Sequence, residues 1–599
     1  MLVAEAKTLN GFLGLNTRDD PAVWPWWVVA QNVMAASGAP DAQALMRPGT
    51  AKLFSTALVD KVCHGLFSWK SEADGLIKLM FAGDTLLYWT GSWTVALTVN
   101  GTWTWAATDQ FSFAATQDMV YIVNGSTGGY GTNWRFDGTD IHPMGGKAPA
   151  SGPTVAAGAA GALTGSYAYV TTDYDTTLAR ETDPSAATSV SLTAQIANIS
   201  AVPANPDTSF NAHRLYRTVA SGERYFYVKQ FTGATTTDQL ADSLLGYEVG
   251  EAGVNKDTIG WVARCIAVTS DGRTVIANDV TNGRPRRIAC SYDQAHPESF
   301  PLSGQMDAGE ENGYGIVVLV PHGDEITVIC EDSIWMINST CTSCTRRVPD
   351  VGGVGPWSAC SSPYGVFLVG HGGVYLFNGT TCRRLTDGIS GTWATVLKSR
   401  LAWTSIVYDG ERDHVLVSVT TTVGGTKNDT VLALDCRTLG SPDPRWSVWT
   451  ISADKLEAIK GWDGTTKYVA FSFQNLGFLG KLDKATYVDF TAASTAAIAI
   501  SMQTGPEDFG ASANNKLVMR AFLETLPKAS GTVTLGLRTD AAVADEASGV
   551  CLMTSRMHRV ALGVRGRVAQ VSLAASNSGV GFGFASLVLE ADILGRRID

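Results

Sequence analysis

The chain has 599 residues, of which 45% are hydrophobic and 17% charged, and its formal net charge is −11. This length allows about four domains or fewer larger ones, and the acidic balance argues against stable nucleic-acid binding, which relies on Lys and Arg to neutralise phosphates. The 10 scattered Cys do not resemble a disulfide framework, and we identify no signal peptide and no long apolar run, so we expect synthesis in a reducing cytoplasm.

The first fifty residues (1–50) predict an extended N-terminal arm. Periodicity is weak there, and two prolines oppose a regular helix. Trp24, Trp26 and Trp27 lie on this irregular segment and need a surface to cover them. That surface is either the body of the chain itself or a neighbouring subunit. The arm ends at a turn signal, Arg-Pro-Gly-Thr, at 47–50.

Residues 51–147 and 251–490 contain a recurring pattern, in which a turn leads into an alternating aromatic or aliphatic strand. The stretches 119–125 and 373–379 are examples, and both end in Asn-Gly, a hairpin signal. The units recur about every 40 to 45 residues, which is the spacing of four-stranded propeller blades. The high content of Gly, Thr, Val and aromatic residues also favours strands and tight turns. The pattern predicts an all-β chain with a degenerate β-propeller of about six to eight blades.

A Pro/Gly/Ala-rich linker at 148–158 interrupts the repeat. A period-two strand at 165–172 follows, and further short strands continue for about 95 residues, enough for one β-sandwich. We therefore predict an inserted immunoglobulin-like or fibronectin-III-like domain at 148–250. Only short helices are expected, one of them near 238–245.

Residues 491–599 change character again and contain several short strand patterns, such as 531–537 and 585–590. They predict a C-terminal β-sandwich or sheets that close the propeller.

No motif in the chain predicts catalysis or a cofactor. Cys341 and Cys344 have the spacing of half a zinc site, but no second pair follows, so two thiols on a turn are expected. The acid pairs Asp19-Asp20 and Glu310-Glu311 are of the kind that two-carboxylate hydrolysis needs, yet such pairs in loops are usually solvated. Neither a G-x-S-x-G elbow nor a P-loop is present. We therefore expect a protein that is not an enzyme, with no catalytic residue, cofactor or metal.

Small basic patches at 284–287, 346–347 and 383–384 could contact phosphate or pair with acids across a subunit boundary. In an acidic oligomer the subunit interface is the favoured interpretation. The Trp residues could stack on bases or sugars, although strand aromatics more often fill a sheet face.

Three groups of short motifs stand out along the chain. The first group is 16–21, 30–33 and 47–50, near the N-terminus. The second and most specific is the stretch 278–298, with its Arg-Pro-Arg-Arg-Ile and Ser-Tyr-Asp segments, continuing into 323–328. The third is the ending, 565–568 and 595–597. Together these motifs resemble the nozzle proteins of short-tailed bacteriophages, also called tail tubular protein B.

The resemblance implies a structural tail protein in the virion, made in the host cytoplasm, that conducts DNA from the portal and helps to retain and eject the genome. It implies a homohexamer that lies below an adaptor ring. The other implied partners are a tail needle or plug, tail fibres or spikes, the double-stranded DNA that passes through, and the host envelope at the distal end. An acidic lumen would repel phosphates and let the duplex slide. The candidate subunit interface is the arm, which would act as a clasp: Arg18, Asp19, Asp20, Trp24, Trp26 and Trp27. Deletion of residues 1–46 would then weaken ring assembly.

Two alternatives remain open. The Trp and Tyr content and the acid pairs also fit a carbohydrate-binding or glycan-cleaving receptor-binding spike. A hub or head-completion protein of a longer-tailed phage would share the same motifs and differ in its neighbours.

Overall fold

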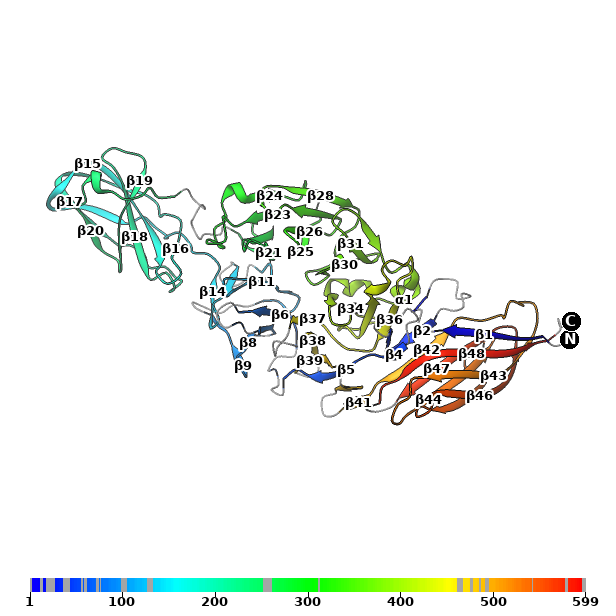
Figure 1. Cartoon of the computed structure of the whole chain (residues 1–599). Helices are drawn as coiled ribbons and strands as arrows, with labels where there is room; N and C mark the ends of the chain where they lie inside the picture. The colour runs from blue at the N-terminus through cyan, green and yellow to red at the C-terminus, as the bar shows by residue number, and fades with distance from the viewer. Residues whose placement is uncertain are drawn as a thin grey trace.

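The computed structural model shows an elongated, almost entirely β chain in which a propeller lies between two smaller β-domains (Figure 1). The insertion forms one end, and both chain termini lie at the other. The predicted all-β class with a propeller is confirmed. The structure describes residues 3–10, 14–17, 27–35, 44–54, 58, 62–71, 75, 77–83, 85–98, 105–126, 133–250, 261–310, 313–460, 467–473, 478–483, 486–490, 495–540, 542–576 and 580–594.

Within this part of the chain the propeller has seven blades, each an antiparallel meander. The first three blades are β6 (Gly65–Lys70), β7 (Ile77–Ala82), β8 (Leu86–Trp89) and β9 (Trp93–Val95); β11 (Ser112–Thr116), β12 (Met119–Val123), β13 (Trp134–Phe136) and β14 (Asp140–Pro143), joined by β10 (Leu97–Thr98); and β21 (Ala263–Val268), β22 (Thr274–Asp279), β23 (Arg284–Cys290) and β24 (Gln305–Asp307). The next three are β25 (Ile316–His322), β26 (Glu325–Cys330), β27 (Ser333–Ile337) and β28 (Cys344–Pro349); β29 (Ala359–Ser362), β30 (Gly365–Gly370), β31 (Gly373–Phe377) and β32 (Cys382–Arg384); and β33 (Ser405–Asp409), β34 (His414–Val419), β35 (Thr430–Asp435) and β36 (Trp446–Trp449). The seventh is β37 (Leu456–Lys460), β38 (Lys467–Phe473), β39 (Phe478–Asp483) and β5 (Gly49–Lys52).

The first strand of each blade faces the propeller axis, and these strands neighbour one another in a closed circle. In order they are β6, β11, β21, β25, β29, β33 and β37, and β37 in turn lies against β6. A separate apolar core fills each junction between adjacent blades. Buried apolar surface therefore stabilises the ring at every junction. Each Å² of apolar surface removed from water contributes roughly 25 cal/mol to the free energy of folding.

An N-terminal strand closes the ring. β5 supplies the outer strand of the seventh blade by pairing antiparallel with β39, with Lys52 opposite Gly480 and Gly49 opposite Asp483. A built Cβ at Gly49 would lie 2.4 Å from the Val488 carbonyl oxygen, so this position requires glycine.

The insertion between the second and third blades contains one six-stranded sheet: β15 (Thr154–Asp175), β16 (Arg180–Glu181), β17 (Thr188–Ser200), β18 (Ala212–Thr218), β19 (Tyr225–Phe231) and β20 (Thr236–Asp238). The 22-residue strand β15 pairs with β17 along its first part and with β18 along its last part. Register shifts interrupt the β15–β17 ladder, and bulges of this kind bend a sheet. Strands β15, β17, β18 and β19 share one apolar core that includes Tyr169 and Leu215.

The second end domain contains strands from both ends of the chain. Its sheets use β1 (Val3–Asn10), β2 (Trp27–Gln31), β3 (Val33–Ala35), β4 (Ala44–Met46), β42 (Ala499–Thr504), β43 (Lys516–Thr525), β44 (Thr532–Thr539), β45 (Ala547–Leu552), β46 (Met557–Gly566), β47 (Ala569–Ser576) and β48 (Gly583–Ile593). The short hairpin β40 (Val488–Phe490) and β41 (Thr495–Ala497) directly precedes β42 in the chain.

The N-terminal segment differs from the extended arm that the sequence predicts. Val3–Asn10 pairs residue by residue with residues 586–593 of β48, and Ala44–Met46 adds to the same strand. The strands are short, and their partners lie at the far end of the sequence, so local periodicity does not reveal them. The described part of the arm belongs to the end domain and to the seventh blade.

The end domain is continuous with the propeller through hydrogen-bonded backbone. β2 pairs with β42 of the end domain and, through Gln31 opposite Val448, with β36 of the sixth blade. One nine-stranded sheet therefore runs from β33 in the propeller to β45 at the edge of the end domain. A single core cluster includes residues of the fifth and sixth blades and of this domain.

Buried Arg47 fixes the same junction. Its guanidinium donates to both carboxylate oxygens of Asp489, at 2.9 and 2.5 Å, and Nε donates to Asn32 Oδ1 at 2.8 Å. Asn32, at φ 59°, also accepts from the Thr450 backbone N–H at 2.8 Å. Asn32, Arg47 and Thr50, which accepts from the Phe490 N–H at 2.9 Å, come from the motifs that carry the family resemblance.

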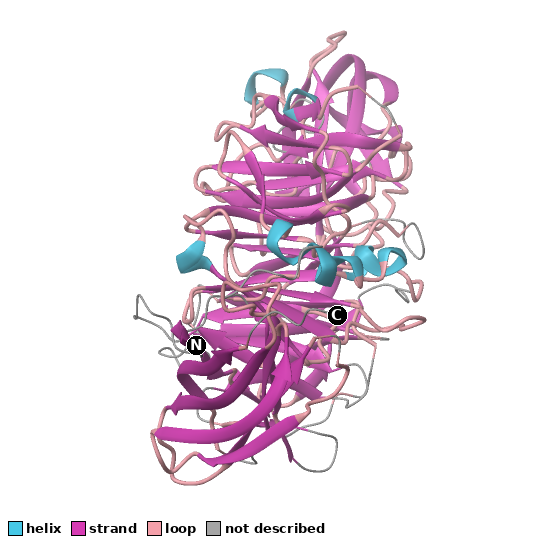
Figure 2. Cartoon of the chain, turned by 90° about the vertical axis from the view of Figure 1, so that its right-hand side faces the viewer, coloured by secondary structure: helices cyan, strands magenta, loops and turns pink. Residues whose placement is uncertain are grey.

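Helices are few and short in the described chain, as Figure 2 shows. They are α1 (Ser390–Ala394) and the 3-10 turns η1 (Asp242–Leu244), η2 (Leu302–Gly304), η3 (Asp387–Ile389), η4 (Lys398–Trp403) and η5 (Cys436–Thr438). η1 lies where the sequence predicts a short helix. Among the described residues, no helix has the length and apolar character needed to cross a bilayer.

Candidate functional site

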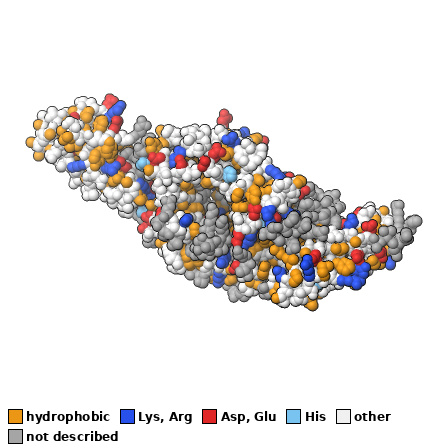
Figure 3. All heavy atoms as spheres, in the orientation of Figure 1, with side chains coloured by type: hydrophobic (Ala, Val, Ile, Leu, Met, Phe, Trp, Pro, Cys, Tyr) orange, Lys and Arg blue, Asp and Glu red, His pale blue; other side chains and the backbone are white. Residues whose placement is uncertain are grey.

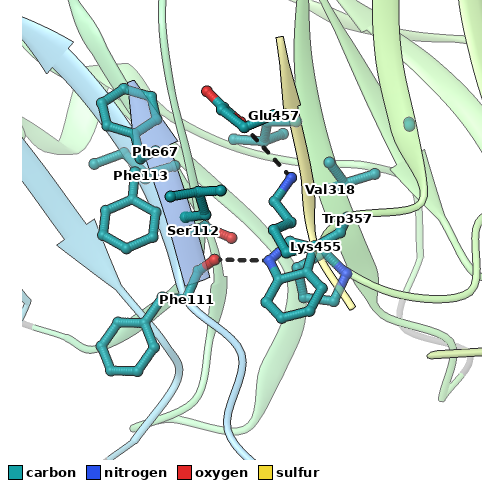
Figure 4. A pocket seen from close by; sticks show the side chains of 13 residues that line it. Phe67, Phe111, Ser112, Phe113, Val318, Trp357, Lys455 and Glu457 are labelled. Atoms are coloured by element: carbon teal, nitrogen blue, oxygen red, sulfur yellow. Dashed lines mark hydrogen bonds and ion pairs between the residues drawn. The ribbon is translucent and has the colours of Figure 1, made fainter. Parts of the chain in front are cut away.

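A pocket of about 150 Å³ lies on the propeller axis, among the innermost strands of six blades (Figure 4). Because each of these strands alternates its side chains between two faces, residues distant in sequence converge here. The lining residues are Leu66, Phe67, Phe111, Ser112, Phe113, Ile266, Val318, Leu319, Pro356, Trp357, Ala359, Lys455 and Glu457.

One wall of the pocket is aromatic. Phe67 and Phe113 stack in parallel with ring centroids 5.5 Å apart and planes inclined by 9°, and Phe111 continues the stack at 6.0 Å from Phe113. Phe67 and Phe113 are half-buried. A Cβ at Gly65 would lie 2.6 Å from the Phe113 ring, so a glycine at the start of β6 makes room for this wall.

The opposite wall carries a partly buried ion pair. Lys455 Nζ lies 3.9 Å from Glu457 Oε2, and the two side chains are 14% and 17% exposed. The other oxygen, Glu457 Oε1, accepts from the Ser68 backbone N–H at 3.0 Å and from the Ser68 hydroxyl at 2.9 Å. Burial raises the pKa of the Glu457 carboxyl, against the opposing effects of Lys455 and Ser68.

Trp357 holds the two walls together. Its indole N–H donates to the Phe111 carbonyl at 3.1 Å, and its ring lies 5.7 Å from Lys455 Nζ, within cation–π range. Figure 4 shows this hydrogen bond and the Lys455–Glu457 pair as dashed lines.

A second concentration of charge lies where the insertion joins the propeller. Glu298, from the third blade, accepts from Arg180 of the insertion at 2.9 Å and from the Gly145 N–H at 2.5 Å. Arg135 of the second blade lies 3.3 Å from the same carboxylate, and all of these charged side chains are at most 8% exposed. These contacts join the insertion to two blades.

His142 lies in the same joint, between Asp137 at 3.2 Å and Asp207 at 3.2 Å. Burial alone would lower the pKa of His142, but the hydrogen bonds to the two carboxylates outweigh burial and raise the pKa to about 8. The same contacts hold the pKa values of Asp137 and Asp207 below their usual range despite burial.

Of the predicted interface residues, Arg18, Asp19, Asp20, Trp24 and Trp26 lie outside the described residues. Trp27 is described, and the prediction that it faces a neighbouring subunit is wrong. It is fully buried in the end domain, edge-on to Phe584 with ring centroids 5.4 Å apart.

The basic patch at 284–287 is engaged within the chain. Arg284 pairs with Asp307, Arg286 with Asp332 and Arg287 with Asp279, at 2.5 to 2.8 Å. Acids of the same chain therefore neutralise this stretch. On the face in Figure 3, acidic and basic side chains are interspersed.

Cys341 is buried in the core between the third and fourth blades, together with Cys290. Glu311, of the second acid pair, lies outside the described residues. The pocket residues Phe67, Phe113, Lys455 and Glu457 were not singled out from the sequence. The sequence signal that could indicate them is the spacing of Lys455 and Glu457, two residues apart at the start of a blade, which places both side chains on the same face of the strand.

No protein-family model and no curated protein matches the chain. Matching solved structures include an exo-beta-1,3-galactanase from Phanerochaete chrysosporium, with 8% identity over 80% of this chain and 95% of that one, at a TM-score of 0.17. A glycoside hydrolase matches with 10% identity over 90% and 100%, at a TM-score of 0.21. Apo AztD from Citrobacter koseri matches with 10% identity over 76% and 100%, at a TM-score of 0.19.

The expectation that the chain is not an enzyme is corrected by this comparison. Because glycan-cleaving enzymes are among the structures that match, the exclusion of enzymatic activity does not hold. At these TM-scores the likeness assigns no activity to this chain.

Proposed function

We propose that this protein is a structural subunit of a short-tailed phage tail, of the nozzle class, that conducts DNA from the virion. The observation that carries the proposal is the nine-stranded sheet shared by propeller and end domain. A subunit that withstands the passage of pressurised DNA needs such mechanical continuity. The sequence resemblance supports the same function through Asn32, Arg47 and Thr50, which form the junction.

The fold supplies stiffness in three places. The propeller ring is closed, which leaves few open sheet edges. β2 joins the sixth blade to the end domain by backbone hydrogen bonds. Buried ion pairs around Glu298 attach the insertion to two blades.

Cryo-electron microscopy of the particle that carries this chain tests the proposal. We expect six copies around an open axis below the portal and its adaptor. Copies in threes at the periphery, away from the axis, would contradict it and would favour a receptor-binding spike.

Glycan recognition is a second candidate function. The axial pocket favours it, because an aromatic wall faces adjacent donor and acceptor groups, and ligand pockets typically combine apolar walls with a few placed polar groups. A glycan array probed with the full-length chain tests this candidate. Binding to a defined terminal sugar would support it, and an array without signal would remove it.

A further inference from the structure

The axial pocket presents polar groups that the protein itself leaves incompletely used. Among the described residues, Lys455 Nζ makes no hydrogen bond, and its contacts are Glu457 Oε2 at 3.9 Å and the Trp357 ring at 5.7 Å. An ammonium carries three donors, and the Lys455 side chain is 14% exposed, so its donors face the open space of the pocket. The pocket therefore favours an occupant that supplies acceptors to Lys455.

The groups beside Lys455 indicate which other chemical features the ligand has. Glu457 Oε2 adds an acceptor beside the Lys455 donors, so a ligand group here must both donate and accept. Hydroxyl groups do both, whereas a carboxylate ligand would face Glu457 with like charge. Opposite this pair, the half-buried Phe67 and Phe113 offer an apolar surface.

The size of the pocket limits the ligand to one ring. A cavity of about 150 Å³ accommodates a molecule the size of benzene, and the axial pocket has this volume. A pyranose has one six-membered ring with an apolar C–H face and adjacent hydroxyls on its edge.

We propose that the axial pocket binds a single pyranose residue, with its C–H face on Phe67 and Phe113 and two adjacent hydroxyls on Lys455 and Glu457. The proposal deepens the second candidate function and is independent of the structural one. A terminal sugar of a glycan and a free monosaccharide share this chemistry.

Ligand-observed NMR and calorimetric titration of the full-length chain with a panel of methyl pyranosides test the proposal. We expect saturable binding of at least one pyranoside, and at least tenfold weaker binding by Lys455→Met, which keeps much of the side-chain volume. Lys147→Met, which alters an exposed Lys, is the matched control and should bind like the wild type.

Phe113→Leu is a second variant that keeps an apolar wall but removes one aromatic face, and it should weaken binding several-fold. Absence of binding by any pyranoside, or equal affinity of Lys455→Met and wild type, would overturn the proposal. Preferential binding of benzoate, used as a small aromatic acid probe, would also overturn it. Pyranoside binding together with a silent glycan array would support the pocket while removing the glycan-receptor function.

Discussion

Arg47 connects three parts of this molecule through hydrogen bonds. It lies on the N-terminal segment, contacts Asp489 after the seventh blade, and donates to Asn32, which in turn binds Thr450 after the sixth blade. The Arg47 side chain is fully buried, and both Asp489 oxygens accept from its guanidinium. Truncation of such a cation leaves a carboxylate without its counter-charge.

We expect Arg47→Met to lower the free energy of unfolding by about 3 to 5 kcal/mol, because Asp489 and Asn32 lose their partner. Denaturant titration followed by Trp fluorescence measures the change. Arg224→Met, which removes an exposed pair with Glu248, is the control and should change stability by less than about 1 kcal/mol. Equal effects of the two variants would contradict the role of Arg47.

Buried Asp454 predicts that the stability of the protein depends on pH. Burial raises the pKa of its carboxyl to about 6, above the ordinary value of 3.8. The folded state therefore binds a proton more tightly than the unfolded state, and stability falls as the pH rises from about 4 through 6.

Asp454→Asn should remove this loss of stability at higher pH, because the amide does not ionise. At pH 7.5 we expect the variant to be more stable than the wild type by up to about 3 kcal/mol, and the difference should shrink toward pH 4. Melting temperatures of both proteins across this range check the sign. A variant less stable than the wild type at pH 7.5 would show that the charged carboxylate is needed.

At the scale of elements, the closing strand β5 is held by a tight backbone approach. A Cβ at Gly49 would meet the Val488 carbonyl at 2.4 Å. Gly49→Ala is expected to destabilise the chain by about 1 to 3 kcal/mol and to increase hydrogen exchange in β39. Gly440→Ala, at a position where a Cβ meets nothing within 4 Å, should leave exchange unchanged.

The sequence predicts the blades better than it predicts their closure. Alternating stretches such as 119–123 and 373–377 become β12 and β31 because each blade pairs locally. β1, β2, β4 and β5 pair with strands hundreds of residues further along the chain, so neither these partners nor the burial of Trp27 can be inferred from local pattern. The pocket was missed for a related reason: Lys455 and Phe113 meet only because seven blades close in a circle.

At the scale of the whole molecule, the two end domains are attached to the propeller by different kinds of interaction. The end domain with the termini shares a sheet with the propeller, whereas the insertion is joined through polar contacts that include His142, Asp137 and Asp207. Because the pKa of His142 is raised to about 8 from 6.5, its contribution to the joint is complete below pH 6.5 and is lost as the pH rises through 8.

We therefore expect hydrogen exchange at 140–147 and 205–210 to increase between pH 6.5 and 9, after correction for intrinsic rates. Exchange in the β43–β48 ladder should not show this added increase. His142→Gln should remove the pH dependence. A wild-type joint whose protection is constant over this range would contradict the assignment.

The pairing of β1 with β48 and of β5 with β39 also sets the order in which the protein can be completed during translation. The first strands leave the ribosome long before their partners exist, while the insertion has its own sheet and core and can fold as soon as it is synthesised. Until β39 emerges, the ring stays open, and the nascent chain exposes strand edges that favour aggregation. Such long-range pairings slow folding, so production of the intact protein should depend on chaperones and on a slow final step at the C-terminus.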